Sequence, residues 1–545
     1  MERLLDAPPL PAANIPAMAL ASAEIFGPST ALIDGERQWT YTDLDEIVHR
    51  MIAAAIALGI EKGDRVGLWG PNTAEWIFAA LGILGAGGIL VPLNTRWSGE
   101  EIGYALQKAD ASALFMSQGF LGLDQIGSLR SAASSLRATE IVVTLEGEVA
   151  GGRTFDEFLA LGAATTREQV EESIAGISPD DPSDIMFTSG TTGRPKGVVL
   201  RHGTSLQLYN SLADLETLRP GDVYLIIPPF FHCFGYKAGW MACLLKGVTM
   251  IPQKVFEVEQ VLDRIEKDKV SVILGPPTIF TDILHSPRLA EIDYSSLRVS
   301  CPSAASVPVE LVKRLSSELG FDVVLNAYGL TEAHGAVSMC HPGDDTELVA
   351  NFAGPPLEGC EVKIVDANGA ALADNEQGEV LVRGYNLMTE YYDDPEATAE
   401  AIDSEGWLHT GDIGFVNEIG YLKITDRKKD MIITGGFNVY PAEVERVLLL
   451  DDTVGEAAVV AAPDERMGEI GIAFVVPRPG TTIDTEALLA SAKGSLAGYK
   501  VPRQVRIVES LPRNASMKVV KHLLRAQLRA EREPVDWRAG PDETP

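Results

Sequence analysis

The segment best suited to bind an anion spans residues 187–197, where hydroxyl side chains alternate with glycines and a lysine follows them. Glycines free the backbone to present N–H groups, and hydroxyls with an ammonium add further donors, a combination that suits a polyphosphate. The spacing differs from that of a Walker A loop, and Gly197 follows Lys196 where that motif has Ser or Thr. The segment predicts a phosphate-binding loop after the apolar run 185–187, although taken by itself it also fits a flexible surface loop.

Five more segments with polar or aromatic residues follow it along the chain. They read Pro-Pro-Phe-Phe-His-Cys-Phe-Gly at 228–235, Tyr-Gly-Leu-Thr-Glu at 328–332, Trp-Leu-His-Thr-Gly-Asp at 407–412, Thr-Asp-Arg-Lys-Lys-Asp at 425–430 with a continuation to 445, and Arg-Asn-Ala-Ser-Met-Lys at 513–518. In this order the segments resemble the motifs of the adenylate-forming enzymes, which include acyl- and aryl-CoA ligases, firefly luciferases and the adenylation domains of peptide synthetases. The resemblance runs from roughly residue 40 to residue 525.

The resemblance implies a reaction in which a carboxylate attacks the α-phosphate of ATP and CoA then takes the acyl group as a thioester. Two anions must meet in the first step, so their charges have to be neutralised and their geometry held in line. By the same resemblance Thr331 contacts the α-phosphate, and Glu332 with Thr188 holds Mg²⁺, a hard ion that takes oxygen ligands. The residues expected to hold the β- and γ-phosphates are Thr188, Ser189, Gly190, Thr191, Thr192 and Lys196.

The resemblance also assigns the nucleoside half of ATP. Tyr328 would stack on adenine, Asp412 would accept hydrogen bonds from the ribose hydroxyls, and Arg427 would assist there. Each residue has a structural alternative: Tyr328 as a core aromatic, Asp412 as a turn residue, and Glu332 as a charge at a helix N-terminus. Relatives usually have a glycine-containing segment where this chain has residues 302–305, so the backbone geometry there stays open. The residues expected beside the base are Ser303, Ala304, Ala305, Asn326, Ala327 and Gly329.

The last segment resembles the family's Ser-Gly-Lys motif, whose lysine bridges the carboxylate and the α-phosphate during adenylation, and Lys518 takes that place here. Met517 stands where the family usually has glycine, and methionine adopts a positive φ only at a cost, so we expect slower adenylation. A solvated surface lysine is the alternative. In the family the small C-terminal domain then rotates about a residue matching Lys429 and presents another face for thioester formation. The residues expected to line the pantetheine tunnel are Gly435, Gly436 and Phe437.

The aromatic segment 228–235 is expected to border the acyl pocket, and it contains no acidic residue. Amino-acid-activating domains usually place an Asp there, so the main prediction is a CoA ligase for an acid that is apolar near its carboxyl end. His232 would gate the pocket and the tunnel, with a core histidine as the alternative. Lys237 would either meet a ketone or second carboxylate of the substrate or, as is more common, extend to the surface.

The identity of the acid is left open by the sequence. The stretch 230–240 resembles ligases for steroid-derived ring propanoates as well as ligases for medium-chain fatty acids. We therefore expect a medium- or long-chain fatty acid or an apolar ring-bearing propanoate, with an aryl acid as a further alternative. Because Met517 and the segment 302–305 depart from the family pattern, a protein that binds nucleotide or acyl-adenylate without turnover is a second hypothesis. Acid-dependent formation of AMP separates the two hypotheses.

The amino-acid composition argues against some classes of binding partner. The 545 residues include 45 Lys and Arg against 77 Asp and Glu, a net charge of −32, which argues against nucleic acid and against docking on anionic membranes. The five cysteines contain no C-x-x-C pair, which is typical of the reducing cytoplasm. Residues 76–95 carry no charge, but glycines and a proline interrupt them, which favours a buried helix and a strand over a membrane span. A homo-oligomer remains open.

The scaffold that must position these segments is predicted to be α/β. Helical patterns alternate with short apolar runs through most of the first 430 residues, as in stacked α/β subdomains with parallel sheets. From about residue 378 closely spaced strands with glycine turns predict a small β-barrel-like part. We expect residues 1–426 to form a large body that binds ATP and the acid. We expect residues 427–545 to form a small, mobile α+β domain with the catalytic lysine and a face of the CoA tunnel.

Overall fold

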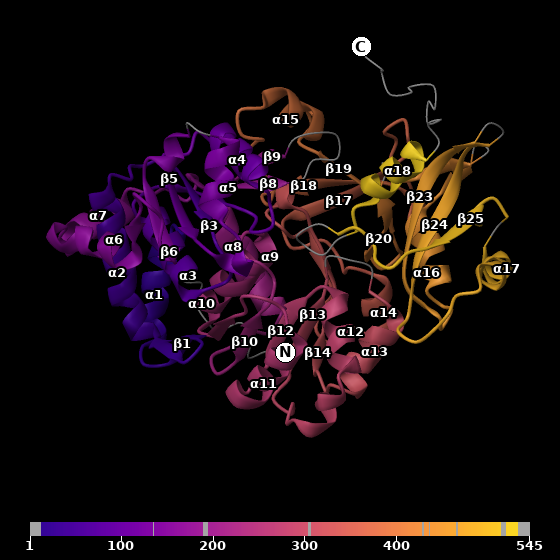
Figure 1. Cartoon of the computed structure of the whole chain (residues 1–545), viewed down its shortest axis with the longest axis horizontal. Helices are drawn as coiled ribbons and strands as arrows, with labels where there is room; N and C mark the ends of the chain where they lie inside the picture. The colour runs from indigo at the N-terminus through magenta and orange to yellow at the C-terminus, as the bar shows by residue number, and fades with distance from the viewer. Residues whose placement is uncertain are drawn as a thin grey trace, which may run out of the picture.

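The computed structural model describes residues 12–133, 136–188, 195–303, 307–427, 430–434, 437–464, 467–496, 498–513 and 519–531. It has the predicted mixed α/β architecture, with a large N-terminal body followed by a small C-terminal domain (Figure 1). The body contains two seven-stranded sheets and a four-stranded antiparallel sheet, and the C-terminal domain contains a five-stranded sheet.

The first seven-stranded sheet leads into the predicted phosphate-binding segment. Its strands, in spatial order, are β7 (Arg153–Thr154), β6 (Val142–Glu146), β5 (Ala113–Ser117), β3 (Arg65–Trp69), β4 (Ile89–Pro92), β8 (Pro182–Thr188) and β9 (Lys196–Arg201). All neighbours are parallel except β8 and β9, which form an antiparallel pair. Helices connect or flank the strands, as the alternating sequence pattern predicts: α2 (Tyr41–Leu58), α3 (Ala74–Gly85), α4 (Gly99–Lys108), α5 (Gln125–Ala132), α6 (Phe155–Leu161) and α7 (Arg167–Ala175).

The second seven-stranded sheet is parallel apart from one edge strand. Its order is β14 (Val323–Val324), β13 (Val299–Pro302), β12 (Val272–Gly275), β10 (Val223–Ile226), β11 (Thr249–Pro252), β1 (Thr30–Asp34) and β2 (Arg37–Thr40), with β2 antiparallel to β1. Its main helices are α1 (Ile15–Phe26), α8 (His202–Leu215), α10 (Ala242–Lys246), α11 (Val258–Asp268), α12 (Pro277–His285) and α13 (Val309–Ser317).

The predicted site segments of the body mostly follow the carboxyl ends of strands in these two sheets. Residues 228–235 follow β10, Ser303 follows β13, and residues 326–332 follow β14. Ligands of open α/β sheets bind outside these ends of the strands. The two sheets also meet there, because the Cys233 sulfur after β10 lies 3.2 Å from the Met186 sulfur of β8. The topology therefore brings segments far apart in sequence to one region.

The uncharged stretch 76–95 forms a buried helix and strand, as predicted. All residues of α3 are buried, and β4 follows it. The glycines in α3 allow close packing on α2, since a Cβ at Gly85 would lie 2.3 Å from the Ile52 Cδ1 atom. Among the described residues, none of the helices has the length and apolar character needed to cross a bilayer.

The predicted barrel-like part is a four-stranded antiparallel sheet of β17 (Cys360–Val365), β18 (Gly378–Gly384), β19 (Leu408–Val416) and β20 (Leu422–Arg427). A short hairpin of β15 (Ala327–Tyr328) and β16 (Ser338–Met339) precedes it, together with α14 (Thr346–Asn351). Helix α15 (Pro395–Ala401) lies between β18 and β19 in the chain. This sheet contributes the expected ribose segment through β19.

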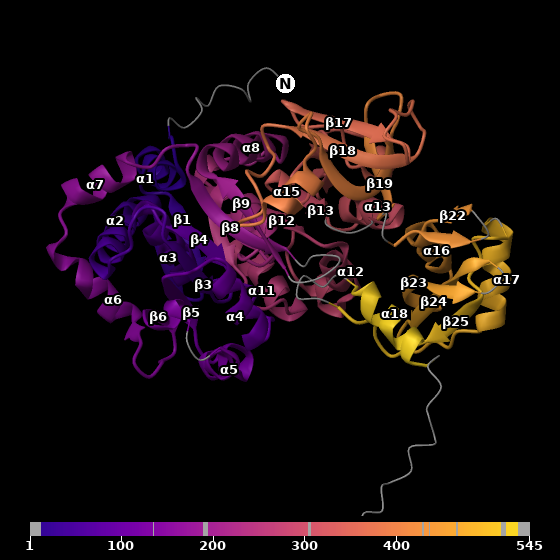
Figure 2. The ribbon, with the colours of Figure 1, turned by 90° about the horizontal axis from the view of Figure 1, so that it is seen from above.

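The C-terminal domain contains β21 (Ile432–Thr434), β22 (Phe437–Val439), β23 (Val454–Asp464), β24 (Gly468–Pro477) and β25 (Gln504–Ile507), with α16 (Pro441–Leu448), α17 (Thr485–Ser495) and α18 (Lys521–Ala530). Its long hairpin β23–β24 separates two apolar clusters, one beneath α16 and α17 and one beneath α18. These elements lie at one end of the molecule, away from α6 and α7, in both views (Figures 1 and 2).

A hydrogen bond connects β20 of the body to α16 of the C-terminal domain, and ion pairs connect elements within that domain. The Asp426 carboxylate of β20 accepts a hydrogen bond of 2.8 Å from the Ala442 amide in the first turn of α16. Lys521 of α18 pairs with Glu445 at 2.8 Å, and Arg525 pairs with Asp430 at 2.8 Å. Helix α18 is thereby tied to the segment that follows β20.

Candidate active site

The mouth of the β8–β9 hairpin places two of the predicted phosphate ligands opposite each other. Thr188 and Lys196 are directly paired in the antiparallel register, and Phe187 faces Gly197. Glycine is needed at 197 because a Cβ there would lie 2.8 Å from the Ile185 Cγ2 atom. Four more predicted ligands of this loop, namely Ser189, Gly190, Thr191 and Thr192, lie outside the described residues.

The predicted adenine and ribose residues are brought together by the hairpin β15–β16 and by β19. The Tyr328 hydroxyl donates to the Asp412 carboxylate at 2.6 Å, so the expected stacking ring and the expected ribose acceptor are in direct contact. Asp412 also faces Arg427 across β19 and β20, although only the backbone of Arg427 is described. The structure therefore brings the residues expected to bind the nucleoside into one region.

The segments expected beside the base also meet. The Ser303 hydroxyl accepts a hydrogen bond of 3.2 Å from the Ala327 amide. Close packing leaves no room for a side chain at Gly329, since a Cβ there would lie 2.0 Å from the Gly335 carbonyl oxygen. The Asn326 side chain instead donates to the Val349 and Phe352 carbonyls at 3.1 and 3.0 Å, so its amide nitrogen anchors the end of α14. Ala304 and Ala305 lie outside the described residues.

The predicted metal residue Glu332 lies in the 3₁₀ turn Thr331–Ala333, just after the adenine segment. One of its carboxylate oxygens accepts a hydrogen bond of 2.8 Å from the Tyr391 hydroxyl. The ring of the same tyrosine lies against the Lys196 ammonium, 4.7 Å from the ring centroid. Tyr391 belongs to none of the predicted motifs, and no local spacing relates it to Glu332 or to Lys196. It is the main site residue that the sequence did not reveal.

The aromatic segment after β10 forms a wall with only part of its surface accessible. His232 accepts a hydrogen bond of 3.3 Å from the Phe234 amide through Nδ1, which fixes its ring and caps the short turn Cys233–Gly235. A π-helical turn, Tyr236–Met241, follows. Phe230 is fully buried, whereas His232 and Phe234 remain half-buried.

The prediction for Lys237 was wrong in both of its forms. The side chain neither extends to the surface nor meets a substrate, because it is fully buried and its ammonium lies 3.0 Å from the Asp184 carboxylate of β8. It also donates to the Ser205 hydroxyl at 2.7 Å. Burial and the nearby Lys237 charge lower the pKa of His202 to about 3. The lysine thus lies at the centre of an interior cluster between β8 and the aromatic segment.

The residues predicted to serve the C-terminal domain mostly lie outside the described part of the chain: Lys429, Gly435, Gly436, Met517 and Lys518. For Phe437 the structure gives only the backbone, in β22. The described residues on either side of 514–518 are joined, because Arg513 and Val519 form an antiparallel bridge. Arg513 also pairs with Glu456 of β23 at 2.7 Å.

Comparison with known proteins decides the family. Residues 21–392 match the family model of the AMP-binding enzymes, and residues 443–518 match that of the AMP-binding enzyme C-terminal domain. The chain belongs to the AMP-binding enzyme family.

Two similar family members have the same name, 3-[(3aS,4S,7aS)-7a-methyl-1,5-dioxo-octahydro-1H-inden-4-yl]propanoyl:CoA ligase. The protein from Rhodococcus jostii RHA1 is 47% identical over 516 residues, which cover 94% of this chain and 98% of that protein. The protein from Mycobacterium tuberculosis H37Rv is 50% identical over 496 residues, covering 91% and 95%. The crystal structure of ATP-bound MatB from Rhodopseudomonas palustris superposes with a TM-score of 0.81 at 29% identity, covering 94% of this chain and 99% of that one.

This AMP-binding enzyme is accordingly an AMP-forming acid–thiol ligase that uses ATP, a carboxylic acid and CoA. Among the described residues, no group of three or more His, Cys, Asp and Glu side chains is placed to hold a metal ion. The oxygens of Glu332 and Thr188 are nonetheless the hard donors that Mg²⁺ prefers.

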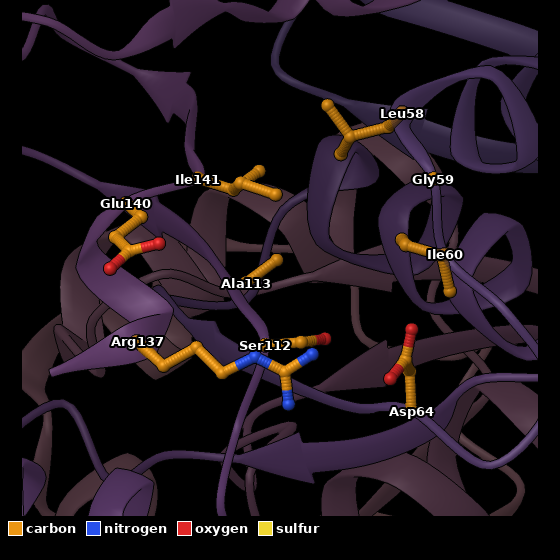
Figure 3. A pocket seen from close by; sticks show the side chains of 9 residues that line it. All are labelled: Leu58, Gly59, Ile60, Asp64, Ser112, Ala113, Arg137, Glu140 and Ile141. Atoms are coloured by element: carbon orange, nitrogen blue, oxygen red, sulfur yellow. The ribbon is translucent and has the colours of Figure 1, made fainter.

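A separate cavity of about 260 Å³ lies at the amino ends of β3, β5 and β6 (Figure 3). Figure 3 shows the Arg137 side chain extending across it toward Asp64. Because the predicted ligands of this AMP-binding enzyme follow the carboxyl ends of strands, this cavity is distinct from the active site. Its lining residues are Leu58, Gly59, Ile60, Asp64, Ser112, Ala113, Arg137, Glu140 and Ile141.

Proposed function

We propose that this ligase joins a ring-bearing propanoate to CoA. The observation that carries the proposal is the 47% and 50% identity, over more than nine-tenths of this chain, to two ligases named for a bicyclic dioxo-propanoate. The half-buried rings of His232 and Phe234 offer partly accessible aromatic surface, which suits a substrate acid that is apolar near its carboxyl end. The buried Lys237 is bound to Asp184, so it does not select for a second acidic group.

In the first half-reaction the carboxylate oxygen attacks the α-phosphorus of ATP, and the bond to the bridging oxygen of pyrophosphate breaks. We assign Thr188 and Lys196 to the phosphates, Tyr328 to the adenine, and Asp412 to the ribose. The ammonium of Lys518 would neutralise charge between the carboxylate and the α-phosphate. Thr331 lies in the same 3₁₀ turn as Glu332, in keeping with a contact to the α-phosphate.

We assign Mg²⁺ to Glu332 and Thr188. When bound, the ion would supply positive charge that ATP requires in a protein whose own net charge is −32. The contact between Glu332 and Tyr391 holds one carboxylate oxygen in place before nucleotide binds.

In the second half-reaction the CoA thiolate attacks the acyl carbon, the bond from that carbon to the AMP oxygen breaks, and AMP leaves. We propose that residues 427–545 form the mobile unit, that Lys429 is its hinge, and that Gly435, Gly436 and Phe437 line the tunnel. The buried free cysteines and the acidic charge support a cytoplasmic location.

A panel of acids tests the proposal. The purified protein would be incubated with ATP, Mg²⁺, CoA and one acid at a time: the bicyclic dioxo-propanoate, the same skeleton without ring ketones, octanoate and benzoate. Thioester, AMP and pyrophosphate would be measured together. We expect kcat/KM for the ring-bearing propanoates to exceed that for octanoate at least tenfold, about the discrimination that one or two apolar contacts supply. Preference for octanoate or benzoate would overturn the proposal, and ATP binding without AMP formation would favour the non-catalytic alternative.

A further inference from the structure

We propose that Tyr391 is a positioning residue that holds the phosphate-binding lysine and the magnesium-binding glutamate at separate, fixed places before ATP arrives. The proposal rests on the functions proposed above for Lys196 and Glu332. It concerns a tyrosine that lies outside all of the motifs found in the sequence.

Tyr391 uses two parts of its side chain for two opposite charges. Its hydroxyl donates to the Glu332 carboxylate at 2.8 Å, and its ring face takes the Lys196 ammonium at 4.7 Å from the centroid. A tyrosine hydroxyl is a donor and a carboxylate accepts only, so the direction of this hydrogen bond is fixed. Each charged group is engaged with the tyrosine rather than with the other, which leaves neither locked in a direct ion pair.

The backbone around Tyr391 is held on the edge of the phosphate-binding hairpin. The Val199 amide of β9 donates to the Glu390 carbonyl at 3.0 Å, and the Tyr392 amide donates to the Gly197 carbonyl at 2.7 Å. The Tyr391 amide donates in turn to the Thr398 hydroxyl of α15 at 2.9 Å. The backbone of the tyrosine is thus fixed by hydrogen bonds on both sides, and its side chain is buried.

The same segment is also joined to the turn that carries Glu332. The Met388 amide donates to the Glu332 carbonyl at 2.7 Å. Two residues earlier, the Asn386 side chain donates to the Ala336 carbonyl at 2.8 Å. The Asn386 carbonyl in turn contacts a ring nitrogen of His334 at 2.8 Å. Residues 386–392 therefore connect the phosphate hairpin to the metal segment, and Tyr391 is the side chain that contacts a functional group on both.

Two substitutions separate the two contacts. Tyr391→Phe keeps the ring face for Lys196 and removes the hydroxyl that holds Glu332. Tyr391→Leu removes both. Tyr392→Phe is the matched control, since it deletes the hydroxyl of the next residue, whose ring packs against a different apolar cluster. Thermal unfolding would verify that each variant is folded, and Tyr391→Phe alone suffices if Tyr391→Leu does not fold.

The measurement is ATP affinity by calorimetry, once with Mg²⁺ and once with EDTA, without acid or CoA. We expect Tyr391→Phe to weaken ATP binding about tenfold with Mg²⁺ and less than twofold with EDTA, since a hydrogen bond to a carboxylate is lost. Tyr391→Leu should weaken binding under both conditions, and Tyr392→Phe under neither. The proposal is overturned if Tyr391→Phe matches the unsubstituted protein, or if it weakens binding equally with and without Mg²⁺. Unsubstituted protein that binds ATP yet forms no thioester would overturn the proposed function alone.

Discussion

The ammonium of Lys237 lies 3.0 Å from the carboxylate of Asp184, and both side chains are fully buried. The pair joins the π-helical turn of the aromatic wall to β8, the strand that ends at Thr188. The Ser183 hydroxyl adds a hydrogen bond of 2.5 Å to the same carboxylate oxygen. A fully buried ion pair thus connects the proposed acid site with the proposed phosphate site.

Removing one member of this pair should cost far more than removing both. Lys237→Met leaves an uncompensated buried carboxylate, so we expect a loss of about 3–5 kcal/mol in the free energy of unfolding. The double variant Lys237→Met, Asp184→Asn should recover most of that loss. Chemical denaturation of the two single variants and the double variant measures the coupling.

A surface pair supplies the control. Lys267 pairs with Glu36 at 3.1 Å, and both side chains are largely exposed. Lys267→Met should change the free energy of unfolding by less than about 1 kcal/mol. Additive losses in the Lys237 and Asp184 variants would show that the buried pair has no special coupling.

The contact between Tyr328 and Asp412 leads to a prediction about nucleotide affinity. Tyr328→Phe keeps an aromatic ring for adenine but removes the donor that fixes the Asp412 carboxylate. We expect ATP affinity to fall about tenfold, in line with the loss of a hydrogen bond to a charged acceptor. Tyr328→Leu should lose more, because the stacking surface is lost as well. If Tyr328→Phe binds ATP as tightly as the unsubstituted protein does, the Tyr328 hydroxyl does not position Asp412 for ATP binding.

The role assigned to Lys518 predicts that the two half-reactions can be separated. Lys518→Ala should abolish formation of acyl-adenylate yet still convert supplied acyl-adenylate and CoA to thioester. Met517→Gly should raise the adenylation rate, because glycine adopts positive φ without cost. Single-turnover assays of each step are the measurement. If Lys518→Ala slows both steps equally, the lysine has another role.

Acid should destabilise the fold through His202. Burial first, and the Lys237 charge second, lower its pKa from 6.5 to about 3, so between these values the unfolded chain binds a proton that the folded chain does not. Stability contributed by this group is present above pH 6.5 and falls as the pH decreases toward 3. From pH 7.5 to 5 the loss is about 2 kcal/mol.

His202→Asn isolates that contribution. Asparagine does not titrate, and its side-chain oxygen can replace the Nδ1 atom that accepts from the Ile15 amide at 3.3 Å. The free energy of unfolding should therefore depend less on pH in the variant than in the unsubstituted protein, by about 2 kcal/mol between pH 7.5 and 5. Parallel pH profiles would contradict the assignment.

Most elements of the fold were predictable because their signals are local. The uncharged stretch 76–95 gives α3 and β4, and the apolar run before residue 188 gives β8. Boundaries were less predictable: the apolar run 185–187 marks only part of β8, which is found as Pro182–Thr188. Hydrogen bonding to the neighbouring strand decides where a strand begins, and the sequence alone does not identify that neighbour.

The contacts between site residues could not be predicted, because they depend on the tertiary fold rather than on local sequence. Tyr328 and Asp412 were each identified by resemblance, but their hydrogen bond depends on how β15 meets β19. Tyr391 is 59 residues from Glu332, and Lys237 is 53 residues from Asp184, so no helical or strand period relates the members of either pair. A charged residue in an apolar stretch indicated that Lys237 was unusual, but the identity of its partner required the tertiary fold.

The hydrogen bond from the Ala442 amide to Asp426 has a consequence for the timing of the catalytic cycle. Any large rotation of residues 430–531 relative to β20 separates these two groups. A bond to a charged acceptor is worth about 1.5–3 kcal/mol, which corresponds to a dwell time longer by roughly 10- to 100-fold. If the C-terminal domain rotates once per turnover, as proposed above, this hydrogen bond would lengthen the time that the domain spends in the present arrangement.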